Sequence, residues 1–301
     1  MVQTTLNLIS HPSYLALQTS ETMLSALMPL VPGFPSVQWL ADTGSTNVDL
    51  VQRARQPARP PLPWLLGADR QLTARGRAGR VWENASGATL MFSCAFQVNL
   101  PLSELLGLSP VMGIAACEAL RGLLAAHCAA GHDETPQNRL QLKWPNDLLW
   151  DQAKLAGILV ESTQITDSTT GARTPLIVVG IGLNLRDGAT LSAQLNRPVA
   201  DWSQIADISP THIVASIARA WSDAISEYSA GGFAVFIKRF EHVDALAGHR
   251  VDVTDQGSIL QTGIALGTDS MGRLLIQTDQ GTTAIMVGDI SIRPSAAVSH
   301  P

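Results

Sequence analysis

Apolar residues recur up to Leu185 in short runs that predict β-strands. Some runs alternate apolar and polar positions, others are continuously apolar, and turn signals such as Pro145-Asn146-Asp147 separate them. The polar stretch Thr163–Thr174 is expected to be a hairpin loop. The predicted strands are Val37–Leu40, Trp64–Arg70, Ala88–Val98, Leu140–Trp144, Leu148–Trp150, Leu155–Glu161 and Pro175–Leu185.

Helical patterns lie between these runs and after them. Ser45 or Thr46 is expected to cap a helix that runs through Val48 to Ala54. Ser109-Pro110 is a typical helix start, and an apolar pattern of helical period continues from Val111 to Ala130. Further helices are predicted at Thr211–Ser229 and Phe233–Leu246, and loops at Arg55–Pro63 and Gly131–Asn138.

From Gly248 onward the pattern changes to short strands joined by Asp/Gly turns, which predicts a small β-barrel. We therefore expect a main domain at residues 37–247 and a small one at 248–295, preceded by a segment, residues 1–36, without an assigned role. The predicted strands of the small domain are Arg250–Val253, Gln261–Leu266, Leu274–Gln277 and Thr282–Ile285.

Composition narrows the class of protein. With 301 residues, 46% of them hydrophobic, the chain can build one sizeable core and a smaller one. A net charge of -5 does not favour non-specific nucleic-acid binding. The start shows no secretory pattern, and no run approaches roughly 18 apolar residues, so a cytoplasmic protein without a membrane partner is expected.

Cysteine and histidine usage adds no site. Cys94, Cys117 and Cys128 lie in apolar contexts without CxxC spacing, which indicates buried free thiols. The seven histidines have no ligand spacing, so no protein-bound metal is predicted.

The segment Gln71–Trp82, QLTARGRAGRVW, carries the densest candidate chemistry. Three arginines (Arg75, Arg77 and Arg80) alternate with glycines. Guanidinium groups suit phosphate and carboxylate oxygens, and the glycines allow close approach to a ligand. Mutual repulsion of the arginines predicts a loop that is mobile when empty and ordered by an anion. A solvated basic turn is the alternative, and no Walker-type GK[ST] follows.

A second candidate is Lys154, which opens the otherwise apolar strand KLAGILVE. Its ammonium suits a phosphate, and Gly157 lets a flat group approach the strand. An ordinary residue at a strand end is the alternative. Trp144 and Trp150 are interpreted as core residues and Asp147 as a turn cap.

Two further segments are less specific. The polar run Ser45-Thr46-Asn47 could donate to an amide-like group or cap a helix. The run GIGLN at Gly180–Asn184 lacks the full dinucleotide fingerprint.

In chain order, STN, Q-x3-RGR-x-GR-x-W, KWPND, KLAGILVE and GIGLN resemble the catalytic domain of biotin protein ligases, over residues 42 to 185. GDISIR at Gly288–Arg293 resembles the small C-terminal domain of that family. The resemblance implies an α+β fold: a mixed sheet flanked by helices, related to class II synthetases, with a small SH3-like β-barrel. The implied enzyme uses ATP and Mg²⁺ to form biotinyl-5′-AMP, and transfers biotin to a lysine of a biotin carboxyl carrier protein of acetyl-CoA carboxylase or a similar carboxylase.

The resemblance also implies roles for particular residues. Arg75, Arg77 and Lys154 match the catalytic cations. The implied biotin contacts are Ser45, Thr46, Asn47, Gln71, Arg75, Gly76, Arg77, Lys154 and Gly157. The implied ATP and adenylate contacts are Arg75, Arg77, Arg80, Trp82, Lys154 and Asn184.

The sequence departs from the family pattern in three places. Ala74 stands where the loop often begins with glycine, and Gly44 where an acidic residue often precedes STN. The region before Asp42 is too short for the DNA-binding helix-turn-helix domain of some members and lacks a basic helix, so no DNA partner is expected.

Two other functions compete with this reading. A lipoate or octanoate ligase has a related fold but needs a longer, more apolar acyl channel. A nucleic-acid-binding module would use the basic loop and the small barrel, but the barrel region has only Arg250, Arg273 and Arg293 against several aspartates, and few aromatics.

Overall fold

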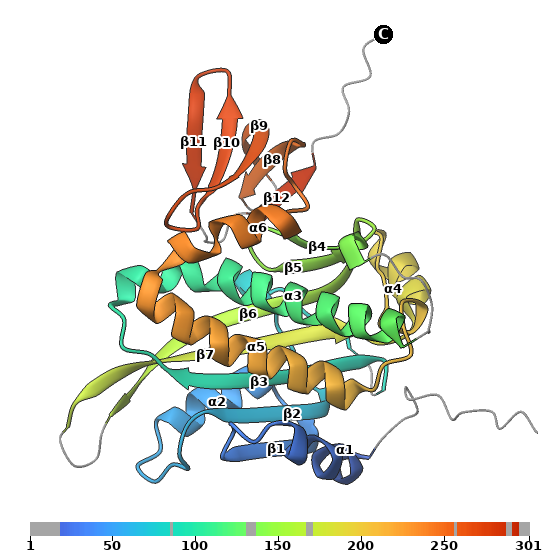
Figure 1. The fold of residues 1–301 in the computed structure, drawn as a ribbon, viewed down its shortest axis with the longest axis vertical. Coiled ribbons are helices and arrows are strands. Elements are labelled where there is room, and N and C mark those ends of the chain that lie inside the picture. The colour runs from blue at the N-terminus through green and yellow to red at the C-terminus, as the bar shows by residue number, and fades with distance from the viewer. Residues whose placement is uncertain are drawn as a thin grey trace, which may run out of the picture.

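A seven-stranded mixed sheet forms the centre of the computed structural model, and a five-stranded antiparallel sheet forms its C-terminal end (Figure 1). The structure describes residues 19–84, 87–130, 137–166, 171–255, 258–286 and 291–294. The predicted fold class, a mixed sheet flanked by helices with a small C-terminal β domain, is confirmed.

The large sheet has the strand order β1-β2-β3-β7-β6-β5-β4. β1 and β2 are parallel, and all other neighbouring pairs are antiparallel. The hairpin β6–β7 is longer than expected: both strands extend into the stretch predicted as loop, of which residues 167–170 lie outside the described part. The strands are β1 Ser36–Thr43, β2 Trp64–Gln71, β3 Thr89–Gln97, β4 Leu140–Lys143, β5 Asp147–Trp150, β6 Ala153–Thr166 and β7 Arg173–Asn184.

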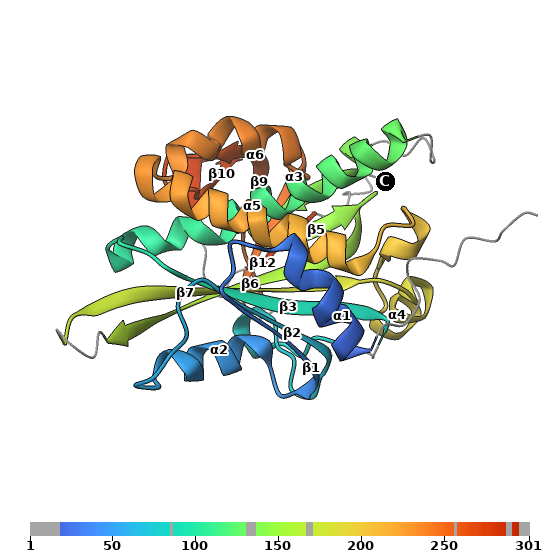
Figure 2. The ribbon, with the colours of Figure 1, turned by 60° about the horizontal axis from the view of Figure 1, so that its bottom comes forward.

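Helices cover the two faces of this sheet unequally. α3 (Leu108–Ala129) and α5 (Pro210–Gly231) pack on each other and on one face, as Figure 2 shows, whereas α2 (Thr46–Ala54) packs on the opposite face against β2, β3, β6 and β7. Successive residues of a strand point to opposite faces. Accordingly, Phe92 and Val179 join the core under α3 and α5, while Ala95 and Val178 join the small core under α2.

α3 is apolar enough and long enough to cross a membrane by length and composition alone. It is instead a core helix, because Val111, Ile114, Leu120 and Leu124 are fully buried in the main core. Cys94 and Cys117 are buried as predicted, while Cys128, near the end of α3, is only partly buried.

The segment before β1, which has no predicted role, contributes to the main core. α1 (Ser20–Leu27) brings Met23 and Leu27 into it, and the stretch after the 3₁₀ turn η1 (Met28–Leu30) adds Val31 and Phe34. Residues 1–18 lie outside the described part. The sequence pattern also missed α4 (Gly188–Leu195), which follows β7.

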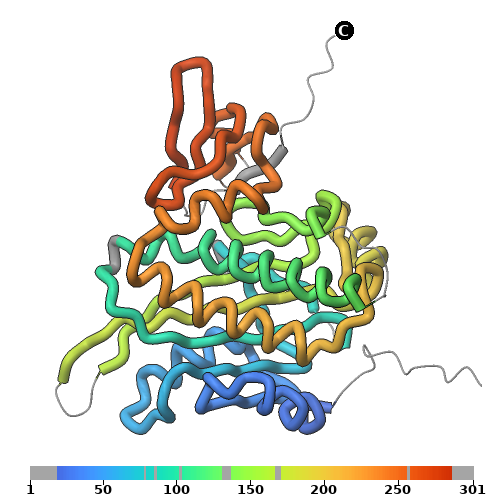
Figure 3. The backbone as a smooth tube through the Cα atoms, viewed as in Figure 1, coloured from blue at the N-terminus to red at the C-terminus, as the bar shows by residue number. Residues whose placement is uncertain are grey.

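The chain passes from α5 through η6 (Phe233–Phe236) and α6 (Ile237–Val243) into the small sheet (Figure 3). The predicted helix Phe233–Leu246 is therefore shorter and begins with a 3₁₀ turn. The strand order is β11-β10-β9-β8-β12, and β12 was not predicted. The strands are β8 Arg250–Asp255, β9 Ser258–Thr268, β10 Leu274–Thr278, β11 Gly281–Ile285 and β12 Ser291–Pro294.

Candidate active site

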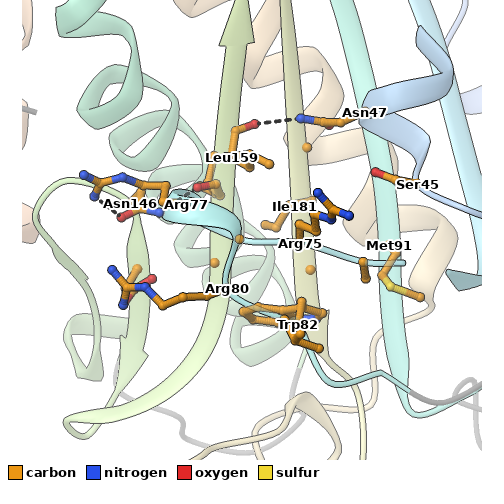
Figure 4. Close-up of a pocket in the computed structure, with 18 of the residues that line it drawn as sticks. Ser45, Asn47, Arg75, Arg77, Arg80, Trp82, Met91, Asn146, Leu159 and Ile181 are labelled. Carbon is orange, nitrogen blue, oxygen red and sulfur yellow. Dashed lines mark hydrogen bonds between the residues drawn. The ribbon is translucent and has the colours of Figure 1, made fainter. Parts of the chain in front are cut away.

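A pocket of about 530 Å³ lies on the α2 side of the large sheet, in the size range of small-molecule sites. Its floor is formed by the strand positions that alternate with the main core: Met91 and Ser93 on β3, Gly157 and Leu159 on β6, and Gly180 and Gly182 on β7. The 72–82 segment supplies another wall (Figure 4). Strand alternation thus builds the core on one face and the pocket on the other.

Three glycines in this floor make room for two of the pocket's own side chains. Gly157 and Gly182 are paired in register on β6 and β7, and the indole of Trp82 lies against both. A Cβ on Gly182 would lie 2.6 Å from Cε2 of Trp82, and one on Gly180 would lie 2.2 Å from Oδ1 of Asn47. The flat group expected beside Gly157 is therefore, in this structure, the protein's own Trp82.

One end of the pocket is a chain of hydrogen bonds between the neutral side chains of Thr46, Ser93 and Asn47, which ends on the carboxylate of Glu161. Asn47 donates through Nδ2 to Oε2 of Glu161 at 2.8 Å and accepts from Oγ of Ser93 at 2.6 Å. The Ser93 and Thr46 hydroxyls are 2.6 Å apart. Because Thr46, Asn47 and Ser93 are buried, their hydrogen bonds fix the orientation of each group.

The expected capping role of Ser45 or Thr46 is wrong in its detail. Ser45 occupies the N-cap position of α2, but its side chain makes no capping hydrogen bond. The Thr46 amide instead donates to Oε1 of Gln71 at 2.8 Å. Gln71 is anchored in turn by Asn84, which accepts from its amide at 3.2 Å and donates to its carbonyl at 3.0 Å. A residue distant in sequence therefore satisfies the helix start.

The arginine-rich segment folds back on itself beside the pocket. Trp82 N donates to Ala74 O at 3.0 Å, and Gly76 N donates to Arg80 O at 2.7 Å, around the short turn η2 (Arg77–Gly79). Arg75, Arg77 and Arg80 all line the pocket. Figure 4 shows Arg77 beside Asn146, to whose Oδ1 it donates at 3.1 Å. The three predicted arginines are thus brought to one site.

Lys154 reaches the same pocket from β6, where its Nζ donates to Oδ1 of Asp147 at 2.6 Å. The same ammonium lies 5.1 Å from the centroid of the Trp82 ring. The interpretation of Asp147 as a simple turn cap is therefore wrong, because its carboxylate is the ion-pair partner of Lys154. Burial would raise the pKa of Asp147, but Lys154, together with Lys143 and Arg197, outweighs it and holds that pKa below its usual value.

Several lining residues had no predicted role in the site. Ser93, Asn146 and Lys143 line the pocket, and so does Arg197, which follows α4. The motif KWPND contained the signal for Lys143 and Asn146, since both belong to it. Arg197 carried no sequence signal, because α4 itself was not predicted.

Asn184 and Trp144 have contacts that the sequence did not reveal. Asn184 is buried, and its amide donates to Lys154 O at 3.3 Å and Ala200 O at 3.2 Å. It lines a smaller adjoining pocket with Trp82, Lys154 and Arg197. Trp144 is a core residue as predicted, but it also lines the main pocket. The indole Nε1 of Trp82 is buried without a hydrogen-bond partner among the described residues.

Two parts of the sequence match known protein families. Residues 44–184 match the model of the Biotin/lipoate A/B protein ligase family, and residues 247–293 match that of the Biotin protein ligase C terminal domain. The first match contains every predicted site residue, and the second covers the small sheet.

Two named proteins are similar to this chain over most of its length. The chain is 30% identical over 266 residues to the Biotin--[acetyl-CoA-carboxylase] ligase of Mycobacterium tuberculosis, covering 86% of this chain and 89% of that protein. It is 30% identical over 230 residues to the Bifunctional ligase/repressor BirA of Escherichia coli, covering 75% of this chain and 65% of that longer protein.

A solved structure shares the fold. The biotin protein ligase from Aquifex aeolicus, in complex with biotin and ATP, superposes with a TM-score of 0.67 at 26% identity. The match covers 87% of this chain and 100% of that chain.

Proposed function

The chain belongs to the biotin protein ligase family, and from that premise we propose that its pocket condenses biotin with ATP to form biotinyl-5′-AMP. The observation that supports this proposal most directly is that neutral polar groups and cations lie at different ends of the pocket. One end presents the neutral chain of Thr46, Asn47 and Ser93, and the other presents the cations of Arg77, Arg80 and Lys154. A ligand with an amide-like head and an anionic tail matches both ends.

The neutral end supports biotin over a lipoyl or octanoyl group. A ureido ring offers N–H donors and a carbonyl acceptor that can add hydrogen bonds to the polar groups of Thr46, Asn47 and Ser93, whereas an acyl chain offers them none. The Gln71 Oε1 already accepts from the Thr46 amide, so its Nε2 is the group placed to donate to a ligand. We assign biotin contacts to Ser45, Thr46, Asn47, Gln71, Gly76 and Gly157.

The cationic end serves the chemistry. The biotin carboxylate, with an ordinary pKa of about 4 to 5, is ionised at pH 7 and needs no general base. It attacks the α-phosphorus of ATP, a new oxygen–phosphorus bond forms, and the bond to the leaving pyrophosphate breaks. Two anions must meet for this to happen, and Arg75, Arg77 and Lys154 oppose their repulsion. Arg80, Trp82 and Asn184 are assigned to the adenylate side.

Residues 72–82, which we call the flap, cover the site. Two backbone hydrogen bonds, from Trp82 N to Ala74 O and from Gly76 N to Arg80 O, keep the flap compact beside the ligand space. Such a cover excludes water from the mixed anhydride, which hydrolyses readily. The flap therefore retains the adenylate until the acceptor arrives.

Mg²⁺ fits the site as a companion of the nucleotide. Asp147 is a carboxylate that lines the pocket, and no group of three or more His, Cys, Asp or Glu side chains able to hold a metal occurs in the described part of the chain. Magnesium is typically held by one or two carboxylates together with substrate phosphates. Asp147 would hold it, and the ion would neutralise phosphate charge.

The acceptor is proposed to be a lysine of a biotin carboxyl carrier protein, in the cytoplasm. Its amine attacks the acyl carbon of the adenylate, the new amide bond forms, the amine proton is lost and AMP leaves. The named relative from Mycobacterium tuberculosis supports this choice, since acetyl-CoA carboxylase stands in its name.

The proposal is tested with the purified chain, biotin, MgATP and a carrier domain. A mass increase of one biotinyl group on the carrier, absent without ATP, is the expected result, and an unmodified carrier together with no biotinyl-AMP would refute it. Thermal stabilisation by biotin but not by lipoate separates the two ligase specificities.

A further inference from the structure

The small C-terminal sheet touches the pocket segment through one buried hydrogen bond. Trp144 is 2% exposed, and its indole Nε1 donates to the carbonyl of Gly272 at 3.0 Å. Gly272 lies in the turn between β9 and β10. The residues on both sides of Trp144, from Lys143 to Asp147, line the pocket. The indole of Trp144 therefore joins the pocket segment, residues 143–147, to a residue of the small domain that lies 128 positions later in the chain.

The turn that accepts this hydrogen bond is internally braced. The Asp269 carboxylate accepts from the amides of Met271 at 2.9 Å and Arg273 at 3.0 Å, and from Nε of Arg273 at 2.6 Å. The Gly272 amide donates to Asp269 O at 3.1 Å. Gly272 has a φ of +80°, a left-handed conformation that favours glycine. The carbonyl offered to Trp144 is thus held in a fixed direction.

The turn is also fitted against the large domain. A Cβ on Gly272 would lie 2.7 Å from Cδ2 of Phe233, so the backbone of the turn rests directly on that ring. The carbonyl of Met271 would lie 3.2 Å from a Cβ on Gly107, which shows a second close approach. These contacts fix the position of the turn relative to the sheet, and not only its shape.

On the pocket side, the segment after Trp144 is connected to the reactive groups. Asn146 exchanges hydrogen bonds with Ile158, at 2.7 Å from its Nδ2 to Ile158 O and 2.9 Å from Ile158 N to its carbonyl. Its Oδ1 accepts from Arg77, and the next residue, Asp147, pairs with Lys154. A displacement of Trp144 would therefore move Asn146 and Asp147 and change their contacts with Arg77 and Lys154.

We propose that Trp144 is a positioning residue, through which the β9–β10 turn of the small domain holds Asn146 and Asp147 in register with Arg77 and Lys154. The small domain then takes part in adenylate formation through backbone contacts, since no described residue beyond Arg197 lines the pocket. This inference rests on the proposed ligase activity.

The test compares two indole hydrogen bonds of the same length. Trp221 is fully buried and donates from Nε1 to Met112 O at 3.0 Å, away from the pocket. Trp144→Phe and Trp221→Phe each remove one such bond, so similar losses of Tm are expected. We expect Trp144→Phe to lower kcat for biotinyl-AMP formation about tenfold, with the KM for biotin changed less than about twofold, and Trp221→Phe to keep the wild-type rate.

Asp269→Ala provides the second arm, because Asp269 braces the turn and does not line the pocket. It should also slow adenylation about tenfold, and the double variant with Trp144→Phe should be no slower than either single variant. The combination with Trp221→Phe should match Asp269→Ala alone.

The inference is overturned if Asp269→Ala keeps the wild-type rate, if the two effects multiply to about 100-fold, or if Trp144→Phe and Trp221→Phe slow the reaction equally. A wild-type protein that forms no biotinyl-AMP would instead refute the proposed function. The two failures are therefore distinguishable.

Discussion

The two faces of the central sheet are built from the same strands but have opposite character. Toward α3 and α5, β3 and β7 direct large apolar side chains such as Phe92 and Val179 into the core. Toward α2, the alternate positions hold Ser93, Gly180 and Gly182, and a pocket remains. Adjacent residues of one strand therefore have different roles: one packs in the core, and the next lines the pocket.

Two aspartates, one in the pocket and one outside it, differ in their electrostatics. Asp147, on the pocket side, has its pKa lowered because Lys154, Lys143 and Arg197 outweigh its burial. Asp244 follows α6 and pairs with Leu142 of the edge strand β4, and burial raises its pKa to about 6 despite a hydrogen bond from the Leu246 amide and the proximity of His249. The cations around Asp147 outweigh its burial, whereas the groups around Asp244 do not.

The largest expected effect removes the pocket's ammonium. Lys154→Ala should lower biotinyl-AMP formation about 1000-fold, because the proposed mechanism places this ammonium beside both reacting anions and because Asp147 would lose its ion-pair partner. Lys238→Ala, an exposed lysine of α6, is the matched control and should remain active. The measurement is labelled biotinyl-AMP in a single turnover, and wild-type levels in Lys154→Ala would remove this residue from its role.

The next effect fills the hollow face. Gly182→Ala should slow adenylation about 100-fold, because its Cβ would displace the Trp82 indole and the flap with it. Ile177→Ala shortens a core side chain on the opposite face of the same strand. It should instead lower the free energy of unfolding by about 3 kcal/mol and leave kcat close to wild type. Adenylation rates and urea unfolding are measured for both variants. If Gly182→Ala and Ile177→Ala slowed adenylation equally, the division of roles between the two faces of the sheet would be contradicted.

A smaller effect concerns the flap. Arg77→Ala removes the contact to Asn146, so the adenylate should escape into solution about tenfold faster than in the wild type. Arg219→Ala on α5 serves as the control. Free biotinyl-AMP is measured after rapid filtration. Unchanged release and unchanged transfer to the carrier would count against a covering role.

The last effect is on stability and depends on pH. The unfolded chain ionises Asp244 near pH 4, whereas the folded protein holds the proton to about pH 6, so this group's contribution to stability is full below pH 4 and is lost as pH rises to 6. Asp244→Asn should therefore stabilise the protein by up to about 3 kcal/mol at pH 7.5 and much less at pH 4. A Tm difference that is the same at both pH values would show that the carboxylate is not buried as described.

Much of the fold and the chemistry was readable from the sequence, because both depend on local patterns. Alternation located the seven strands of the large sheet, and helical periodicity located α2, α3 and α5. The clustered arginines and Lys154 identified four of the cations that line the pocket, although not Lys143 and Arg197. Strand ends were the least accurate, since the β6–β7 hairpin continues through polar residues of the two strands that pair with each other.

Tertiary structure alone decided which distant groups meet. Gln71 satisfies the start of α2, Asp147 pairs with Lys154, Arg197 reaches the pocket from just after an unpredicted helix, and Gly272 accepts from Trp144. A sequence pattern records which face of an element is apolar, because burial acts on each residue locally. It does not record register between elements, because directional contacts form only after the sheet has paired and the domains have packed.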